Sequence, residues 1–99
     1  MARKNVEFHE EAAGEFLAAV EWYLARNERV ASRFAQQVTH AVQLIAQAPQ
    51  RWPSYSHGTR KFVLLRFPFL VIYRELATVI QVLAVAHAHR RPGYWKFQR

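Results

Sequence analysis

The residues best suited to chemistry lie at the end of the chain, where an apolar run leads into a cationic and aromatic segment. Residues 79–85 read VIQVLAV, and the residues that follow carry imidazoles, guanidinium groups and aromatic rings. Such groups at the exit of a strand suit a site that binds an anion or a nucleic acid. They could instead cover the edge of the core, because amphipathic side chains commonly shield apolar surface. The members of this group are His87, His89, Arg90, Arg91, Tyr94 and Trp95.

Further positive charge lies on or beside the strands that the sequence predicts between residues 60 and 86. Its carriers are Arg60, Lys61, Arg66 and Arg74. Cations gathered on one face attract a polyanion at long range and neutralise its charge. We predict that these residues join the C-terminal group in a single basic surface. The alternative is a scattered set of solvated charges.

Charge is divided unevenly along the 99 residues, whose net charge is +7. Residues 1–28 have a net charge of −3, whereas residues 29–99 have a net charge of +10 and Glu75 as their only acid. Aspartate is absent from the sequence. So positive a balance predicts an acidic or polyanionic partner, such as a nucleic acid, the ribosome or an acidic protein segment.

The residue types exclude several kinds of site and location. Without cysteine there are no disulfides or thiolate metal sites, and a cytoplasmic location is expected. No uncharged apolar run approaches the roughly 18–20 residues that span a bilayer. His87 and His89 would share a strand face, but no aspartate or cysteine exists to complete a metal site. The serines near His57 lack the buried acid and the strand–turn–helix frame of a nucleophile. We therefore predict no metal, no other cofactor and no membrane association.

Hydrophobic periodicity predicts one strand and two helices in the first half of the chain. Residues 5–8 form a short strand candidate. From Glu10 to about residue 26, apolar residues recur every three or four positions, and the same period runs from Val30 until Pro49 ends it. Two amphipathic helices joined by a few residues form an antiparallel hairpin.

The second half predicts three strands, after a loop at residues 50–59. They cover residues 60–65, 69–74 and 78–86, and the last two are apolar enough to lie centrally or to be covered on both faces. We expect one α+β domain over residues 1–99 with two layers and the order β-α-α-β-β-β. An antiparallel helix hairpin packs on a small sheet whose C-terminal part is an antiparallel meander. The place of the first strand in that sheet stays open.

Several segments together carry a resemblance to a known family. They are residues 6–12, Pro49, residues 58–60, residues 66–73 with the sequence RFPFLVIY, and the ending 83–95. In these segments and their order the chain resembles the RelE/ParE toxin superfamily, the toxin halves of bacterial type II toxin–antitoxin modules. It looks most like the ParE-like branch of plasmid stabilisation proteins.

The resemblance implies one of two activities. RelE-like members cut mRNA on the ribosome, whereas ParE-like members are thought to poison DNA gyrase without catalysing a reaction. Cleavage of RNA needs a base, an acid, and cations that stabilise the charge of the transition state. By resemblance to the nucleases, these roles would fall to Lys61, Arg66, His87, Arg90 and Tyr94.

One arginine of the RelE-like nucleases, on the middle strand of the meander, is replaced in this sequence. Counting back from Tyr73 puts Leu70 at its position, and Arg66 is the nearest cation. Losing one such cation could cost about 100-fold or more in rate. We therefore favour a growth-inhibiting toxin that poisons DNA gyrase without catalysis. The alternatives are a ribosome-dependent mRNA endoribonuclease and a non-toxic nucleic-acid-binding module.

The resemblance also implies a protein partner, a cognate antitoxin whose C-terminal segment wraps the toxin in a hetero-oligomer. A positive net charge favours an acidic partner, and sheet edges and a helix-hairpin groove offer surfaces for it to cover. Trp22, beside the apolar stripe of the first helix, is the candidate contact. It could equally be packed in the core.

Overall fold

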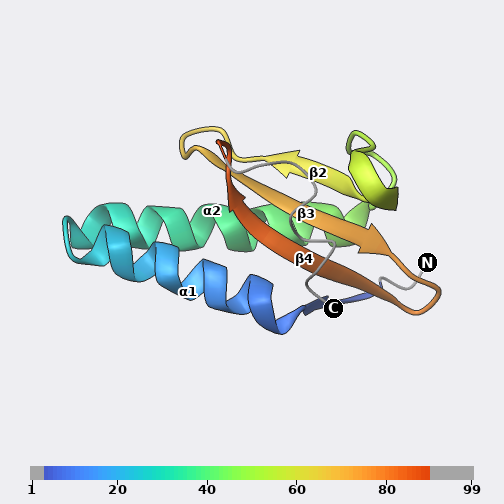
Figure 1. Cartoon of the computed structure of the whole chain (residues 1–99), viewed down its shortest axis with the longest axis horizontal. Helices are drawn as coiled ribbons and strands as arrows, with labels where there is room; N and C mark the ends of the chain where they lie inside the picture. Colours follow the sequence, from blue (N-terminus) through green and yellow to red (C-terminus); the bar gives the residue numbers. More distant parts are fainter. Residues whose placement is uncertain (1–3, 90–99) are drawn as a thin grey trace.

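The computed structural model describes residues 4–89, which form a helix hairpin packed on one four-stranded sheet (Figure 1). A 3₁₀ turn at Ser56–Gly58 interrupts the loop between the second helix and the second strand. The α+β class and the order β-α-α-β-β-β are as predicted. The elements are β1 (Asn5–Phe8), α1 (Glu10–Leu24), α2 (Glu28–Gln47), β2 (Arg60–Val63), β3 (Phe69–Glu75) and β4 (Val79–His87).

The sheet has the strand order β1-β4-β3-β2. Strands β2, β3 and β4 form the predicted antiparallel meander, and β1 pairs parallel to β4 with Asn5 opposite Val79. A parallel neighbour requires a crossover connection, and here the helix hairpin followed by β2 and β3 connects β1 to β4. The first strand, whose place the sequence left open, therefore lies at one edge, and β3 and β4 are central.

Local signals in the sequence set the ends of the helices. The His9 Nδ1 atom accepts a hydrogen bond from the Glu11 amide at 3.1 Å, which caps the start of α1. The Asn27 side chain accepts hydrogen bonds from the amides of Arg29 and Val30, at 2.9 and 3.3 Å, and caps α2. Because Asn27 serves this second cap, α1 ends at Leu24, slightly earlier than its periodicity predicted. Neither described helix is long and apolar enough to cross a membrane.

The main core lies between the hairpin and the sheet. Phe34 and Tyr73 are its largest fully buried side chains. The Phe34 ring lies 5.3 Å from the Phe67 ring and 5.0 Å from the Phe69 ring, and Tyr23 packs against all three. Such aromatic pairs add to the free energy gained by burying their area. This aromatic cluster fixes α1 and α2 to the start of β3.

A second, smaller apolar cluster lies on the outer face of the sheet, the face away from the helices. It contains Ile72, Leu83, Ala84 and Ala86, with Leu70 packed against it. An irregularity in the pairing of β3 with β4 lets the neighbours Leu83 and Ala84 belong to the same cluster. Both faces of the two central strands are therefore apolar, as their near-continuous hydrophobicity predicted.

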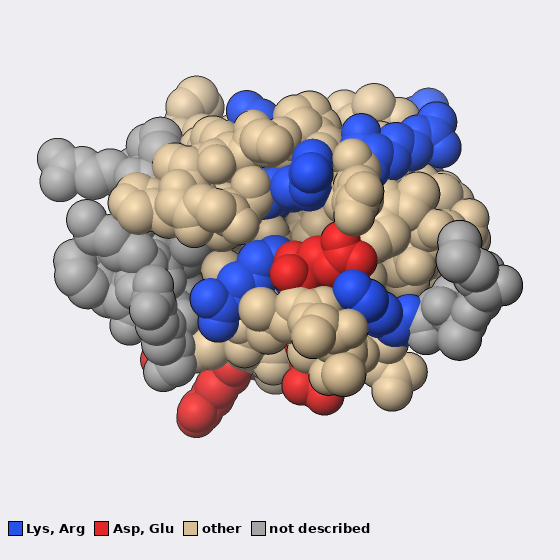
Figure 2. All heavy atoms as spheres, turned by 90° about the vertical axis from the view of Figure 1, so that its right-hand side faces the viewer, with Lys and Arg blue, Asp and Glu red and all other residues tan. Residues whose placement is uncertain are grey.

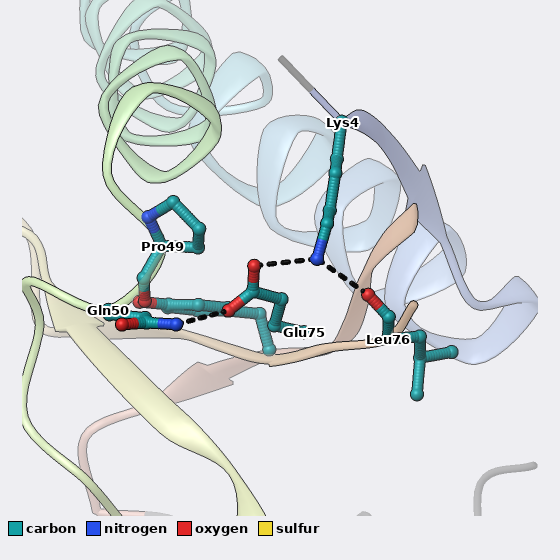
Figure 3. A network of polar contacts seen from close by, with 6 residues as sticks. Lys4, Pro49, Gln50, Glu75 and Leu76 are labelled. Atoms are coloured by element: carbon teal, nitrogen blue, oxygen red, sulfur yellow. Dashed lines mark hydrogen bonds and ion pairs between the residues drawn. The ribbon is translucent and has the colours of Figure 1, made fainter. Parts of the chain in front are cut away.

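A polar network closes the end of the molecule where β1 begins and β3 ends (Figure 3). The Lys4 Nζ atom lies 2.7 Å from a carboxylate oxygen of Glu75 and donates to the Leu76 carbonyl at 2.9 Å. Gln50 donates to the other oxygen of Glu75 at 3.4 Å. The hydrogen bond from Lys4 lowers the pKa of the Glu75 carboxyl below its usual value. Figure 2, which looks at this end, shows acidic atoms in a hollow between basic ones.

Candidate functional site

An apolar groove lies between α1 and the ends of β3 and β4. It has a volume of about 630 Å³ and is lined mainly by small and aromatic side chains. We call it the α1–β4 groove. Its lining residues are Glu15, Ala18, Ala19, Trp22, Tyr23, Pro68, Phe69, Val85, Ala86 and His87.

Trp22 forms one wall of this groove and is not part of the core. Its side chain is 54% exposed, and its ring meets the Tyr23 ring edge-on at 5.1 Å. The Arg26 guanidinium lies 3.6 Å from the centre of the Trp22 ring, and it also donates to the Trp22 carbonyl at 2.8 Å. This cation–π contact holds the indole in place while leaving it open to a partner. The sequence allowed Trp22 to lie either in a groove or in the core, and the structure places it in the groove.

Glu15 places one carboxylate in the groove, at the edge of β4. Strand β1 covers that edge only as far as Val82. Three residues further on, the Val85 amide donates to the Glu15 carboxylate at 3.0 Å. A side chain of α1 thus satisfies a backbone donor that a neighbouring strand would otherwise bind. Among the described residues, the groove therefore combines apolar walls with one acidic side chain.

His87 lines the same groove, at the end of β4. Its ring lies 5.3 Å from the Phe69 ring and 5.2 Å from the His89 ring. The His87 Nδ1 atom accepts a hydrogen bond from the His89 amide at 3.2 Å. Within residues 4–89, no three histidine, aspartate or glutamate side chains come together as metal ligands.

Two members of the predicted basic surface, Lys61 and Arg74, lie on the outer face of the sheet. Lys61 is paired across the strands with Ile72, and its Nζ atom lies 4.6 Å from the centre of the Tyr55 ring. Arg74 follows Ile72 by two residues on β3, so it shares the same face, and its Nε atom donates to Gln81 at 2.9 Å. These two cations therefore stand beside the outer apolar cluster.

The other described members lie elsewhere. Arg60 is paired with the core residue Tyr73, so it points to the helix side, and it donates to the Trp52 carbonyl at 2.7 Å. Arg66 lies in the connection between β2 and β3 and lines a separate hollow beside α2. His87 lies in the α1–β4 groove. The described cations are thus distributed over several faces, because neighbours along a strand alternate between its two sides. Arg90, Arg91, Tyr94 and Trp95 fall outside the described residues.

The centre of the outer face differs from what the nuclease prediction requires. Leu70, at the position where the nucleases carry an arginine, packs against the outer apolar cluster. Of the residues assigned to catalysis by resemblance, Lys61 lies on the outer face, Arg66 beside α2 and His87 in the groove. Arg90 and Tyr94 lie outside the described part of the chain. The described residues of the catalytic prediction are therefore not assembled in one place.

Glu15 and Arg33 are residues of interest that were not singled out from the sequence. Glu15 lies seven residues before Trp22 on α1, so the two share a helix face, and this spacing was the available signal. Arg33 lines the hollow beside α2 together with Arg66. Its signal was the absence of acidic residues from α2 after Glu28.

Comparison with known proteins places this geometry in a family. No curated protein matches the sequence. A solved structure described as the chromosomal ParDE TA system from P. aeruginosa has the same fold, with a TM-score of 0.75 at 22% sequence identity. The match covers 86% of this chain and 96% of that one. The family model of the ParE toxin of the type II toxin–antitoxin system parDE matches residues 6–92. The chain therefore belongs to the ParE toxin family of type II toxin–antitoxin systems.

Proposed function

We propose that this ParE-family toxin acts in the cytoplasm by poisoning DNA gyrase without catalysing a reaction, and that a cognate antitoxin neutralises it. The observation that carries the non-catalytic part is the apolar centre of the outer sheet face. Leu70 packs there against the outer apolar cluster, where RNA cleavage would need a cation close to the scissile phosphate. Membership of the ParE family supports gyrase as the target.

The contacts of the cations nearest to the outer apolar cluster also support a non-catalytic toxin. The Lys61 ammonium group lies against the Tyr55 ring, and the Arg74 guanidinium is bonded to Gln81. Tyr73 faces the helices and donates its hydroxyl proton to the Pro49 carbonyl at 2.6 Å. Burial raises the pKa of Tyr73 to about 12, so its phenol is a poor general base at neutral pH. These described groups therefore serve packing and hydrogen bonding.

The α1–β4 groove supports the proposal of an antitoxin. Helix-in-groove recognition uses apolar side chains of a partner segment in a groove of this kind. Trp22 is large, partly exposed and held in one orientation, and residues of this type dominate binding energy at protein interfaces. We propose that the antitoxin covers Trp22 and neighbouring apolar residues of the groove.

The experiment that tests the mechanism compares two readouts on the same purified toxin. Gyrase, relaxed plasmid and ATP are incubated with increasing toxin, and both supercoiling and cleaved plasmid trapped by detergent are measured. In parallel, mRNA is translated in vitro with the toxin and examined for cuts by primer extension. We expect supercoiling to fall and cleaved plasmid to rise, with no cuts in the mRNA.

Stoichiometry and reversal provide the controls. A toxin that acts without turnover should inhibit gyrase in proportion to the toxin bound, whereas a nuclease continues to cut substrate with time. Prior mixing with the antitoxin should abolish the inhibition. Cuts in mRNA with undisturbed gyrase would replace this proposal by the ribosome-dependent nuclease. Neither effect, together with normal growth of cells that express the toxin, would favour the non-toxic binding module.

A further inference from the structure

The helix α2 and the connection between β2 and β3 enclose a second hollow, of about 520 Å³, which the proposed function does not use. We call it the α2 hollow. Four of its residues recur on α2 at spacings of three and four, which places them on one face over about 10 Å of helix. Arg66 approaches this face from the connection between the strands. The polar lining consists of Arg33, Gln36, Gln37, His40 and Arg66.

The hollow offers hydrogen-bond donors and positive charge without any compensating acid. No aspartate or glutamate lines it, and residues 29–47 of α2 contain none. Within residues 4–89, these five polar side chains have no hydrogen bond or ion pair with one another or with other groups. Arg33 and Arg66 are both exposed. A concave site lined with unpaired donors of this kind is suited to an anionic ligand.

We infer that the α2 hollow binds the phosphodiester backbone of duplex DNA. Guanidinium groups match the geometry of phosphate oxygens in two-point hydrogen bonds, and glutamine amides are common phosphate donors. Arg33 on the helix and Arg66 on the connection supply two separate charges. A polyanion with regularly spaced phosphates can engage both at once.

The aromatic residue of the hollow favours a duplex over other anionic partners. The Phe67 ring packs 5.2 Å from the Tyr23 ring and 5.3 Å from the Phe34 ring, on the core side. It is therefore committed to the core, whereas single-stranded nucleic acids require open aromatic faces on which their bases stack. An acidic protein segment would also be expected to use apolar or aromatic anchors at the centre of its interface. The backbone of a duplex, whose bases are already stacked, requires neither.

This inference rests on the proposed function, because gyrase binds DNA. A toxin bound to the complex of gyrase and DNA can reach the duplex. The binding itself can be measured without gyrase. In the gyrase complex, contact through the α2 hollow would hold the toxin on both the enzyme and its DNA substrate.

The test is binding of the 99-residue protein to a fluorescent 20-base-pair duplex, followed by anisotropy between 50 and 200 mM salt. Wild type is compared with Arg33→Gln/Arg66→Gln and with the control Arg29→Gln/Arg51→Gln, which removes the same charge from exposed arginines outside the hollow. Each lost phosphate contact lowers the slope of log affinity against log salt by about 0.9. The loss of affinity across this salt range should therefore be about 12-fold smaller in the hollow variant than in wild type. The control variant should keep the slope of wild type.

Several outcomes would overturn the inference. They are a wild-type protein that does not bind the duplex, a hollow variant with an unchanged slope, and a control that loses as much as the hollow variant. Binding of a polyglutamate peptide that Arg33→Gln/Arg66→Gln abolishes, with duplex binding intact, would assign the hollow to an acidic protein instead. Thermal unfolding of the variants confirms that they fold, since exposed substitutions change stability little.

The two proposals can fail separately. If the wild type poisons gyrase but the hollow variant binds the duplex as wild type does, only the inference about the hollow is lost. If the hollow variant loses duplex binding while the wild type leaves gyrase untouched, only the gyrase proposal is lost.

Discussion

The α1–β4 groove and the α2 hollow belong to the same helix hairpin, yet they offer opposite chemistry. The groove presents Trp22 and Phe69 with the Glu15 carboxylate, whereas the hollow presents Arg33 and Arg66 with amide donors. The helices differ in the same way. Helix α1 contains four glutamates and no lysine or arginine, and α2 has its one glutamate in the first turn. One hairpin can therefore serve two partners that are recognised by different forces.

The difference has a consequence that can be measured. Burial of apolar surface in the groove is largely independent of ionic strength, because it removes hydrocarbon from water. Attraction of a polyanion to the hollow weakens steeply as salt rises. Salt should thus separate binding at the two regions without any substitution.

The substitution with the largest expected effect breaks both regions together. Phe34 packs against Phe67, which lines the hollow, and against Phe69, which lines the groove. Phe34→Ala should lower the free energy of unfolding by about 3–5 kcal/mol, measured by urea denaturation, and weaken both binding reactions. Leu65→Ala is the control, because Leu65 is 94% exposed. An unchanged unfolding midpoint for Phe34→Ala would contradict this account of the core.

A second substitution separates the regions. Trp22→Ala should weaken binding of the antitoxin by about 2 kcal/mol, roughly 30-fold, measured by calorimetry, while duplex binding stays as in wild type. Leu24→Ala is a matched control, since Leu24 is as exposed as Trp22 and does not line the groove. If both variants bound the antitoxin equally well, the groove would not be its site.

A third substitution lies away from both regions and should leave both binding reactions intact. Tyr73→Phe removes the hydrogen bond to the Pro49 carbonyl and should cost about 1 kcal/mol of stability at neutral pH. Burial raises the pKa of Tyr73 to about 12 from an ordinary value of 10.0. The neutral phenol is therefore favoured in the folded state, so its contribution is complete below pH 10 and is lost as pH rises toward 12. Alkaline unfolding curves should show this loss in wild type and not in the variant.

The smallest effect is expected at the polar network, which likewise lies apart from both regions. Glu75→Gln should cost at most about 1 kcal/mol at pH 7, because the pair with Lys4 is partly exposed. Since Lys4 lowers the pKa of Glu75 in the folded state, the stabilisation is present above the ordinary value of 4.5 and is lost as pH falls through the lower folded value. Urea denaturation should show wild type and variant converging at acid pH. A gap that stays constant would assign the effect to packing.

Much of the fold could be predicted because its signals are local. The two helices were evident from apolar periodicity, the end of α2 from Pro49, and the central position of β3 and β4 from their continuous hydrophobicity. The position of β1 beside β4 was not predictable, because pairing between residues 5–8 and 79–82 depends on the whole topology.

The candidate site was harder to predict than the fold. Arg60 and Lys61 are adjacent in the sequence and positive, but strand alternation places them on opposite faces. The irregularity beside Leu83 changes which residues of β4 face outward, and no sequence signal marked it. The Arg26 guanidinium holds the Trp22 ring at the groove. The sequence did not reveal this contact, so it could not decide whether Trp22 lies in the groove or in the core.

The pairing of β1 with β4 determines when the protein can fold. The partner of Asn5 is Val79, so β1 cannot form its backbone hydrogen bonds until β4 has been synthesised. Contacts between such distant residues are slow to form, and they follow the helix hairpin, whose contacts are local. During synthesis the hairpin is therefore complete while its sheet is not. The toxin can reach its native form only once residues 79–82 have been synthesised.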